Sequence, residues 1–327
     1  MDVLYLFLDR RFLMFYSDFL YGGPPCQDFS GCNRCPKANS IKNSLLTTFL
    51  SFVDHYRPKY FMLENVRGLL QHRLGSTQKK VGFGVQGGIQ QGSVKFILRA
   101  LTSLGYSAQF QMLQAAEHGA PQSRRRVFFW GALLGLKLPL YPQPTHVCKG
   151  LSAPTNTFTM GKTAPHNSVT IGEAISDLAA FDWRIEVPGE DRQARRQREF
   201  GIPTAGLPTD KKGSVGNSSC LYAYEPITEF QRGVRRYVKG DVVNNHVTRR
   251  FNSDTMLRLA RVPMRPKANH KDLPLEHDLK CLRSKAAARS NFYPNRYYRL
   301  DFKEQFQTCL TNVDPGSENG KVNAILH

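Results

Sequence analysis

The first 150 residues alternate short apolar runs with amphipathic ones, and this alternation constrains the fold more than any other feature of the chain. Four apolar runs have the length of buried strands: 18–21, 60–63, 110–113 and 127–130. Two longer runs show the apolar spacing that is typical of helices: 43–55 and 94–104. The resulting order, β-α-β-α-β-β, predicts an α/β fold with a largely parallel sheet.

The chain changes character after Pro139. Pro139, Pro142 and Pro144 mark a linker, and the sequence that follows is richer in arginine and in short elements. Within it, residues 192–198 (RQARRQR) form either a solvated basic surface or a phosphate-contacting segment. Earlier in the chain, the Gly- and Gln-rich residues 75–93 predict a flexible loop. The sequence therefore predicts an α/β region followed by a smaller, basic region.

A formal net charge of +19 over 327 residues favours a polyanionic partner, with nucleic acid preferred over a merely soluble surface. The 7 cysteines fit a reduced intracellular protein better than a disulfide framework. Cys32 and Cys35 form one C-x-x-C pair, but no second pair stands at zinc spacing, so no metal site is expected. Asp9, Arg10 and Arg11 interrupt the apolar first 20 residues, which favours a buried element over a membrane span.

Cys26 and Glu64 each stand just after a predicted strand, at the edge where α/β sheets place their sites. Cys26 lies in a Pro-Pro-Cys-Gln turn and is either a buried structural cysteine or a nucleophile activated by its surroundings. Glu64 opens Glu64-Asn65-Val66 and is either part of a helix cap or a carboxyl group poised for proton transfer. Neither residue alone distinguishes these alternatives.

Arginines occupy two further positions with potential chemistry. In the run 122–126 (QSRRR), alternation along a strand would put Gln122, Arg124 and Arg126 on one face. The apolar strand that follows favours inward-pointing guanidinium groups over a solvated basic edge, and such groups bind carboxylates, phosphates or base edges. Arg299, in the run 298–301 (YRLD), by itself indicates only an arginine near a strand and a turn.

In this order along the chain, Pro-Cys-Gln (25–27), Glu-Asn-Val (64–66) and Gln-x-Arg-x-Arg (122–126) resemble the DNA cytosine-5 methyltransferase family. The similarity is specifically to its eukaryotic maintenance type and to fungal relatives, and it covers most of the chain from Asp18 to His327. Further similar stretches lie between and beyond the motifs: 29–31 with 33–34, 42–45, 56–60, 138–142 with 144–146, 170–171 with 176–178, 258–263, 271–274 and the tail from 298.

This resemblance implies a fold class and a domain plan. The fold is an incomplete Rossmann-like, S-adenosylmethionine-dependent methyltransferase sheet with a smaller, basic target-recognition region. Residues 1–148 would form the catalytic subdomain, 149–297 the linker and target-recognition region, and 298–327 the start of the return to the catalytic domain. The family's glycine-rich cofactor turn and its closing segments are not found. We therefore expect a piece of a longer enzyme, or a degenerate copy, that binds S-adenosylmethionine poorly or not at all.

The resemblance also implies roles for individual residues. Cys26 would add to C6 of cytosine, Glu64 would bind N3 and the exocyclic amine, and Arg126 would hold O2, with Arg124 as a further candidate. The base would be flipped out of double-stranded DNA before it reacts. Pro25 would line the S-adenosyl-L-methionine site. The residues expected to contact DNA are Gln27, Ser30 and Arg299. The family implies a nuclear location, a role in epigenetic silencing and no membrane association.

Three alternative functions compete with this one. A pseudo-methyltransferase that only binds DNA is favoured by the missing cofactor half and disfavoured by the intact trio Cys26, Glu64 and Arg126. An RNA cytosine-5 methyltransferase of the transfer-RNA branch would carry a Cys-Phe-Thr run, which the chain lacks. A plain arginine-rich nucleic-acid-binding module leaves the ordered motifs unexplained. The DNA methyltransferase is the leading hypothesis.

Overall fold

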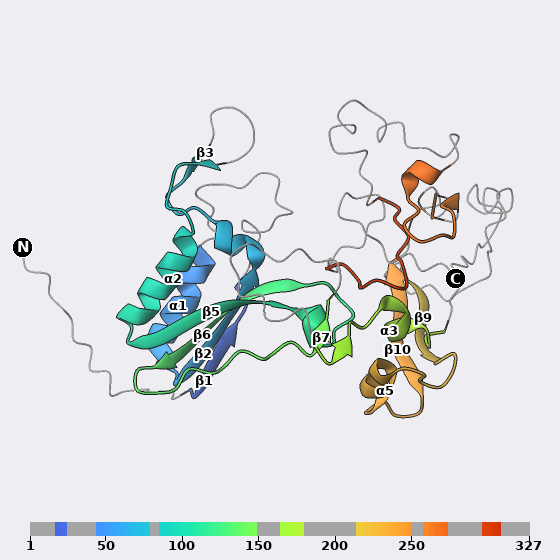
Figure 1. Ribbon diagram of the computed structural model, residues 1–327, viewed down its shortest axis with the longest axis horizontal. Helices are drawn as coiled ribbons and strands as arrows, with labels where there is room; N and C mark the ends of the chain where they lie inside the picture. The colour runs from blue at the N-terminus through green and yellow to red at the C-terminus, as the bar shows by residue number, and fades with distance from the viewer. Residues whose placement is uncertain are drawn as a thin grey trace, which may run out of the picture. The chain divides into compact units, whose positions relative to one another are not determined.

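A four-stranded sheet forms the centre of the first of two compact units into which the protein divides (Figure 1). The computed structural model describes residues 17–24, 44–78, 85–148, 164–179, 214–249, 261–273 and 296–308, with 251, 255, 258 and 259. The first unit contains the residues up to 117, then 124–145 and 150–164. The second unit contains 118–123, 146–149 and the residues from 165 onward.

The sheet has the strand order β1-β2-β6-β5. Its strands are β1 (Phe19–Gly22), β2 (Tyr60–Val66), β5 (Tyr106–Gln114) and β6 (Arg125–Leu133). β1 and β2 are parallel, but β6 runs antiparallel to both of its neighbours, β2 and β5. The α/β class is confirmed, whereas the largely parallel sheet is wrong. The short connection 115–124 explains the difference, because a parallel β5–β6 pair would need a crossover of a dozen or more residues.

Both predicted helices are confirmed, and both pack on one face of this sheet (Figure 1). They are α1 (Ser44–Tyr56) and α2 (Gly92–Ser103). Their buried side chains recur every three or four residues, which gives each helix one apolar face: Leu46, Phe49, Leu50 and Val53 in α1, and Val94, Ile97 and Leu101 in α2. From the sheet, the core receives Phe61, Leu63, Val127 and Phe129. In the described part of the chain, no helix is long and apolar enough to cross a membrane.

The region expected to be a flexible loop contains an ordered hairpin. After the 3-10 helix η2 (Arg67–Gln71), β3 (Thr77–Gln78) pairs antiparallel with β4 (Val85–Gln86). Leu74 and Ile89 exchange both backbone hydrogen bonds, at 3.2 and 2.8 Å. Glycine-rich composition therefore does not prevent strand pairing here. Residues 79–84 lie outside the described residues.

The second unit is built around a two-stranded antiparallel sheet of β9 (Ser214–Leu221) and β10 (Val242–Arg249). The described residues of this unit include the short helices α3 (Ile171–Ile175) and α5 (Glu229–Arg235) and the 3-10 helix η4 (His270–Asp272). A short parallel pair joins β7 (His146–Val147) to β8 (His166–Asn167). A small separate core contains Phe251, Leu259, Val262, Ala268, Leu273 and Tyr297.

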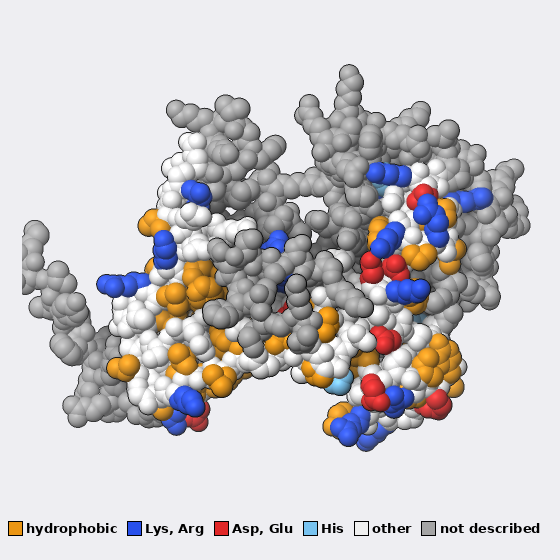
Figure 2. Space-filling model, in the orientation of Figure 1, with side chains coloured by type: hydrophobic (Ala, Val, Ile, Leu, Met, Phe, Trp, Pro, Cys, Tyr) orange, Lys and Arg blue, Asp and Glu red, His pale blue; other side chains and the backbone are white. Residues whose placement is uncertain are grey.

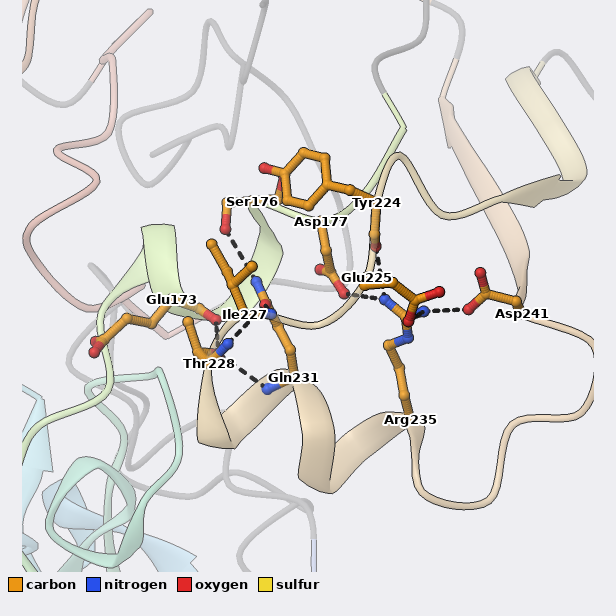
Figure 3. A network of polar contacts seen from close by, with 10 residues as sticks. All are labelled: Glu173, Ser176, Asp177, Tyr224, Glu225, Ile227, Thr228, Gln231, Arg235 and Asp241. Atoms are coloured by element: carbon orange, nitrogen blue, oxygen red, sulfur yellow. Dashed lines mark hydrogen bonds and ion pairs between the residues drawn. The ribbon is translucent and has the colours of Figure 1, made fainter.

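Arg235, the last residue of α5, has a largely buried side chain at the centre of a cluster of charged groups in this unit (Figure 3). Its Nη1 donates to Asp177 Oδ2 at 3.2 Å and to the Tyr224 carbonyl at 2.9 Å, and its Nη2 pairs with Asp241. The guanidinium lies 3.9 Å from the centre of the Tyr222 ring. Burial lowers the pKa of Arg235, but the hydrogen bonds and charges of Asp177 and Asp241 outweigh it and raise the pKa above its ordinary value. This arginine therefore has a structural role.

A substitution of Gly131 in β6 tests how the core of the first unit packs. A Cβ atom at this position would overlap the ring of Phe61 on β2. We predict that Gly131→Ala lowers the free energy of unfolding by about 1–3 kcal/mol in urea denaturation. The control Gly233→Ala, where an added Cβ meets nothing within 4 Å, should cause no loss. If Gly131→Ala is as stable as the wild type, the described packing of Phe61 is incorrect. In a Phe61→Leu background, the cost of Gly131→Ala should shrink.

Candidate active site

Glu64 and Arg126 form an ion pair between neighbouring strands of the first unit. Side chains of β2 alternate between buried and partly exposed positions, and Glu64 occupies a partly exposed one. Arg126 lies near the start of β6 and is paired in register with Val66. Its Nε donates to Glu64 Oε1 at 2.9 Å, and the exposed fractions of the two side chains are 15% for Arg126 and 31% for Glu64. The pair is sheltered, while the carboxylate remains accessible to a ligand.

The two residues that follow β1, Gly23 and Pro24, lie beside the Glu64 carboxylate. Asn65, which is only 1% exposed, donates from Nδ2 to the Pro24 carbonyl at 3.3 Å, while its Oδ1 accepts from the Val66 amide at 2.9 Å. A Cβ atom on Gly23 would lie 3.1 Å from Glu64 Oε2, closer than most side chains tolerate. Asn65 and Gly23 thus bring the start of the Pro-Pro-Cys-Gln turn up to Glu64.

Arg124 precedes β6, and its main chain is held by the end of β5. The Arg124 amide donates to the side-chain oxygen of Gln114 at 2.6 Å, and the Arg124 carbonyl accepts from the Ala115 amide at 3.0 Å. Gln114 is a buried polar residue that the sequence analysis did not single out. β6 begins at Arg125, so only Arg126 of the expected face (Gln122, Arg124 and Arg126) is within the strand.

Gln122 belongs to the second unit, where it forms an isolated parallel bridge with Phe306. The Ser123 amide donates to the Phe306 carbonyl at 2.7 Å, and the Phe306 amide donates to the Pro121 carbonyl at 2.8 Å. Thr308 adds a side-chain hydrogen bond to the Ser123 carbonyl at 3.1 Å. The segment that leads into the arginine motif is therefore paired with residues 306–308.

Three histidines, His118, His146 and His166, lie near one another in the second unit. The rings of His146 and His166 have their centres 5.2 Å apart, and burial, with His166 and His118 nearby, lowers the pKa of His146. The Nε2 atom of His118 is buried without a hydrogen-bond partner. Among the described residues, however, no group of three or more His, Cys, Asp or Glu side chains is arranged to hold a metal ion.

Arg299 is buried, with an exposed fraction of 6%. Its Nη2 donates to the carbonyls of Leu259 and Val262, both at 2.8 Å, and its Nε donates to the Pro263 carbonyl at 3.2 Å. Burial lowers the pKa of Arg299 from its ordinary value. These contacts give Arg299 a structural function within the second unit, and its expected contact with DNA stays a prediction.

Several predicted site residues lie outside the described residues: Pro25, Cys26, Gln27 and Ser30. The same holds for Cys32, Cys35 and the basic run 192–198. Of the predicted catalytic set, the structure thus brings together Glu64 and Arg126 and places Arg124 two residues before Arg126.

The visible surface of the second unit carries mixed charges (Figure 2). Lysine and arginine side chains are interleaved there with carboxylates. Lys267 pairs with Glu304 at 2.6 Å, Arg232 pairs with Glu229 at 2.7 Å, and Arg265 pairs with Asp272. Part of the positive charge in this unit is therefore neutralised internally.

The fold and the Glu64–Arg126 pair define an α/β protein with a polar site near strand ends, as is usual for enzymes of this architecture. Residues 9–264 match the model of the C-5 cytosine-specific DNA methylase family, and the chain belongs to that family. Enzymes of this family act on DNA and use S-adenosylmethionine as the methyl donor.

Relatives with curated names agree with this assignment. DNA (cytosine-5)-methyltransferase 1A of Oryza sativa subsp. japonica is 30% identical over 95% of this chain and 18% of its own length. The sea urchin (Paracentrotus lividus) enzyme PliMCI is 31% identical over 79% of this chain and 14% of its own. Mouse DNA (cytosine-5)-methyltransferase 1 is 26% identical over 93% of this chain and 20% of its own length. The chain thus spans no more than a fifth of the length of these relatives.

Among solved structures, a mutant of Spodoptera frugiperda DNMT2 is similar, with a TM-score of 0.28 and 16% identity. The similarity covers 52% of this chain and 40% of that one.

Arg299 provides a test that separates a structural role from direct DNA contact. We predict that Arg299→Ala lowers the stability of the second unit by about 2 kcal/mol, because three carbonyls, two of them in buried hydrogen bonds, lose a charged donor. Hydrogen exchange at residues 259–262 should accelerate. The control Arg236→Ala removes an exposed arginine and should leave this exchange unchanged. Weaker DNA binding by Arg299→Ala, with unaltered exchange, would contradict the structural role.

Proposed function

We propose that this chain is the catalytic region of a DNA cytosine-5 methyltransferase. It would methylate C5 of a cytosine flipped out of double-stranded DNA, through a covalent adduct with Cys26. The observation that carries the proposal is the Glu64–Arg126 pair, held at 2.9 Å beside the start of the Pro-Pro-Cys-Gln turn. Membership of the family, shown by the match over residues 9–264, supports the same reaction.

The ion pair is chemically suited to the polar edge of a cytosine ring. The Glu64 carboxyl would bind N3 and the exocyclic amine, and the Arg126 guanidinium would donate to O2. Because Arg126 already uses Nε to bind Glu64, the two side chains would meet the base in a fixed relative orientation. Such preorganised donors stabilise negative charge as it develops on the ring.

The covalent step would begin at Cys26, which follows Pro24 by two residues, a separation that spans at most about 7 Å. The thiolate would add to C6, forming the S–C6 bond while the C5–C6 π electrons move toward C5 and the ring. Protonation or hydrogen bonding at N3 by Glu64 would offset the added charge. After C5 has gained a methyl group, loss of its proton to a base would restore the double bond and expel the Cys26 thiolate.

S-adenosylmethionine, when bound, would supply that methyl group. Pro25 is the position of this chain proposed to line the cofactor, next to the nucleophile. In the described residues around it, Gly22 and Gly23 leave little room: an added Cβ would meet the Phe49 ring at 2.7 Å and the Glu64 carboxylate at 3.1 Å, respectively. Gly22 and Gly23 therefore allow the main chain to pack closely against Phe49 and Glu64. They are not proposed to bind the cofactor.

The proposed enzyme divides into a catalytic subdomain and a region that recognises the DNA target. Residues 1–148 would form the catalytic subdomain, 149–297 the linker and target-recognition region, and 298–327 the start of the return to the catalytic domain. Gln27 and Ser30 would contact DNA, with Arg124 near the base. Arg299 would contribute to DNA binding indirectly, through the segment whose carbonyls it binds. A nuclear location and a role in epigenetic silencing belong to the same proposal, because the plant and mouse relatives are DNA methyltransferases of eukaryotes.

A duplex that contains 5-fluorocytosine tests this proposal, since fluorine at C5 cannot be lost as a proton and the adduct persists. We predict a denaturation-resistant protein–DNA adduct with the wild type plus S-adenosylmethionine, and none with Cys26→Ala. The matched controls Cys148→Ala and Cys220→Ala should still form it. Burial raises the pKa of the Cys220 thiol, which disfavours that residue as a nucleophile.

Each other outcome counts against a defined part of the proposal. An adduct that persists in Cys26→Ala would remove Cys26 as the nucleophile. Retained duplex binding with no adduct at saturating S-adenosylmethionine would favour a DNA-binding protein without activity. An adduct formed only with transfer RNA that contains 5-fluorocytosine, and not with the duplex, would favour an RNA substrate.

A further inference from the structure

We propose that Gln114 is a positioning residue that fixes the main chain of Arg124 and so orients its guanidinium toward the substrate. This proposal rests on the proposed function, since Arg124 is a candidate catalytic residue only in a cytosine methyltransferase. It begins where the β5–β6 ladder ends. The last registered pair of that ladder is Gln114 with Arg125, and Arg124 lies one residue beyond it.

The main chain of β5 leaves the sheet at this point. Ala115 starts the 3-10 helix η3 (Ala115–His118), so β5 offers no further carbonyl in line with the ladder. The Gln114 side chain supplies the missing acceptor: its Oε1 accepts from the Arg124 amide at 2.6 Å. The Ala115 amide completes the pairing by donating to the Arg124 carbonyl at 3.0 Å. The side-chain amide thus extends the ladder by one residue.

Because Gln114 is buried, loss of its hydrogen bond to the Arg124 amide would be costly. Gln114 is 4% exposed, and water cannot readily replace a lost acceptor at such a site. A side chain one methylene shorter would not reach as far, and an apolar side chain of equal length would leave the Arg124 amide without this partner. The position therefore requires an oxygen acceptor at the end of a long side chain.

The consequence falls on the arginine motif. β6 begins at Arg125, but the Arg124 carbonyl still pairs with the Ala115 amide. If this pairing keeps the chain extended at Arg124, its side chain would project to the same side as Arg126, because residues two apart on an extended chain share a face. Arg126 is itself bound to Glu64. If the Arg124 main chain rotated, its guanidinium would leave that face while the Glu64–Arg126 pair stayed intact. Gln114 would therefore affect Arg124 without altering the ion pair.

Two variants of Gln114 separate positioning from general packing. Gln114→Met keeps the length and removes the acceptor, whereas Gln114→Glu restores an oxygen acceptor. Gln111→Met, three residues earlier on β5, is the matched control. We expect Gln114→Met to accelerate hydrogen exchange of the Arg124 amide on the order of tenfold or more. Exchange at residues 127–130 should be unchanged, and Gln111→Met should resemble the wild type. Gln114→Glu should protect the Arg124 amide better than Gln114→Met does, because it keeps an oxygen acceptor, while the burial of its carboxyl group lowers overall stability. Unchanged exchange in Gln114→Met would overturn the proposal.

A double-mutant cycle on adduct formation with the 5-fluorocytosine duplex tests the link to Arg124. Gln114→Met should slow the adduct on the order of 10- to 100-fold, with the duplex dissociation constant nearly unchanged. In an Arg124→Ala background it should cause no further loss. Equal losses in both backgrounds would show that Gln114 does not act through Arg124. A wild type that forms no adduct would contradict the proposed function, while the exchange experiment would still decide whether Gln114 positions Arg124.

Discussion

The ion pair between Glu64 and Arg126 is the interaction on which the candidate site depends. It exists because β6 runs antiparallel to β2 in a register that aligns Arg126 with Val66, so that the arginine reaches back to the carboxylate at 2.9 Å. A slip of one residue would send Arg126 to the opposite face of the sheet, into the helix-covered core. The apolar core that fixes this register, with Phe61, Leu63, Val127 and Phe129, thereby fixes the geometry of the polar site.

Much of this arrangement is predictable from the sequence, because apolar periodicity is a local signal. The two helices and the strands that carry Glu64 and Arg126 follow directly from it. The direction of β6 depends instead on the short connection between β5 and β6, and strand spacing alone does not reveal the pairing. Gln114 is equally hidden, since Gln109 and Gln111 stand on the same strand and only the three-dimensional ladder distinguishes their roles.

The arginines show why charge composition predicts function only coarsely. Arg299 donates to three backbone carbonyls, and Arg235 is held by two aspartates, so both stabilise the second unit itself. Arg126 is bound to a carboxylate that remains accessible. A positive net charge favours a nucleic-acid partner, but burial and bonding decide which guanidinium groups remain for that partner.

The central claim is that Glu64 and Arg126 act on the target base as one unit. The most direct test is a double-mutant cycle, with Glu64→Gln and Arg126→Met, on the rate of covalent adduct formation with a 5-fluorocytosine duplex and S-adenosylmethionine. We predict that each single variant reacts much more slowly than the wild type. The double variant should react at most about tenfold more slowly than the slower single variant. Losses that multiply in the double variant, or single variants that react at the wild-type rate, would contradict the claim.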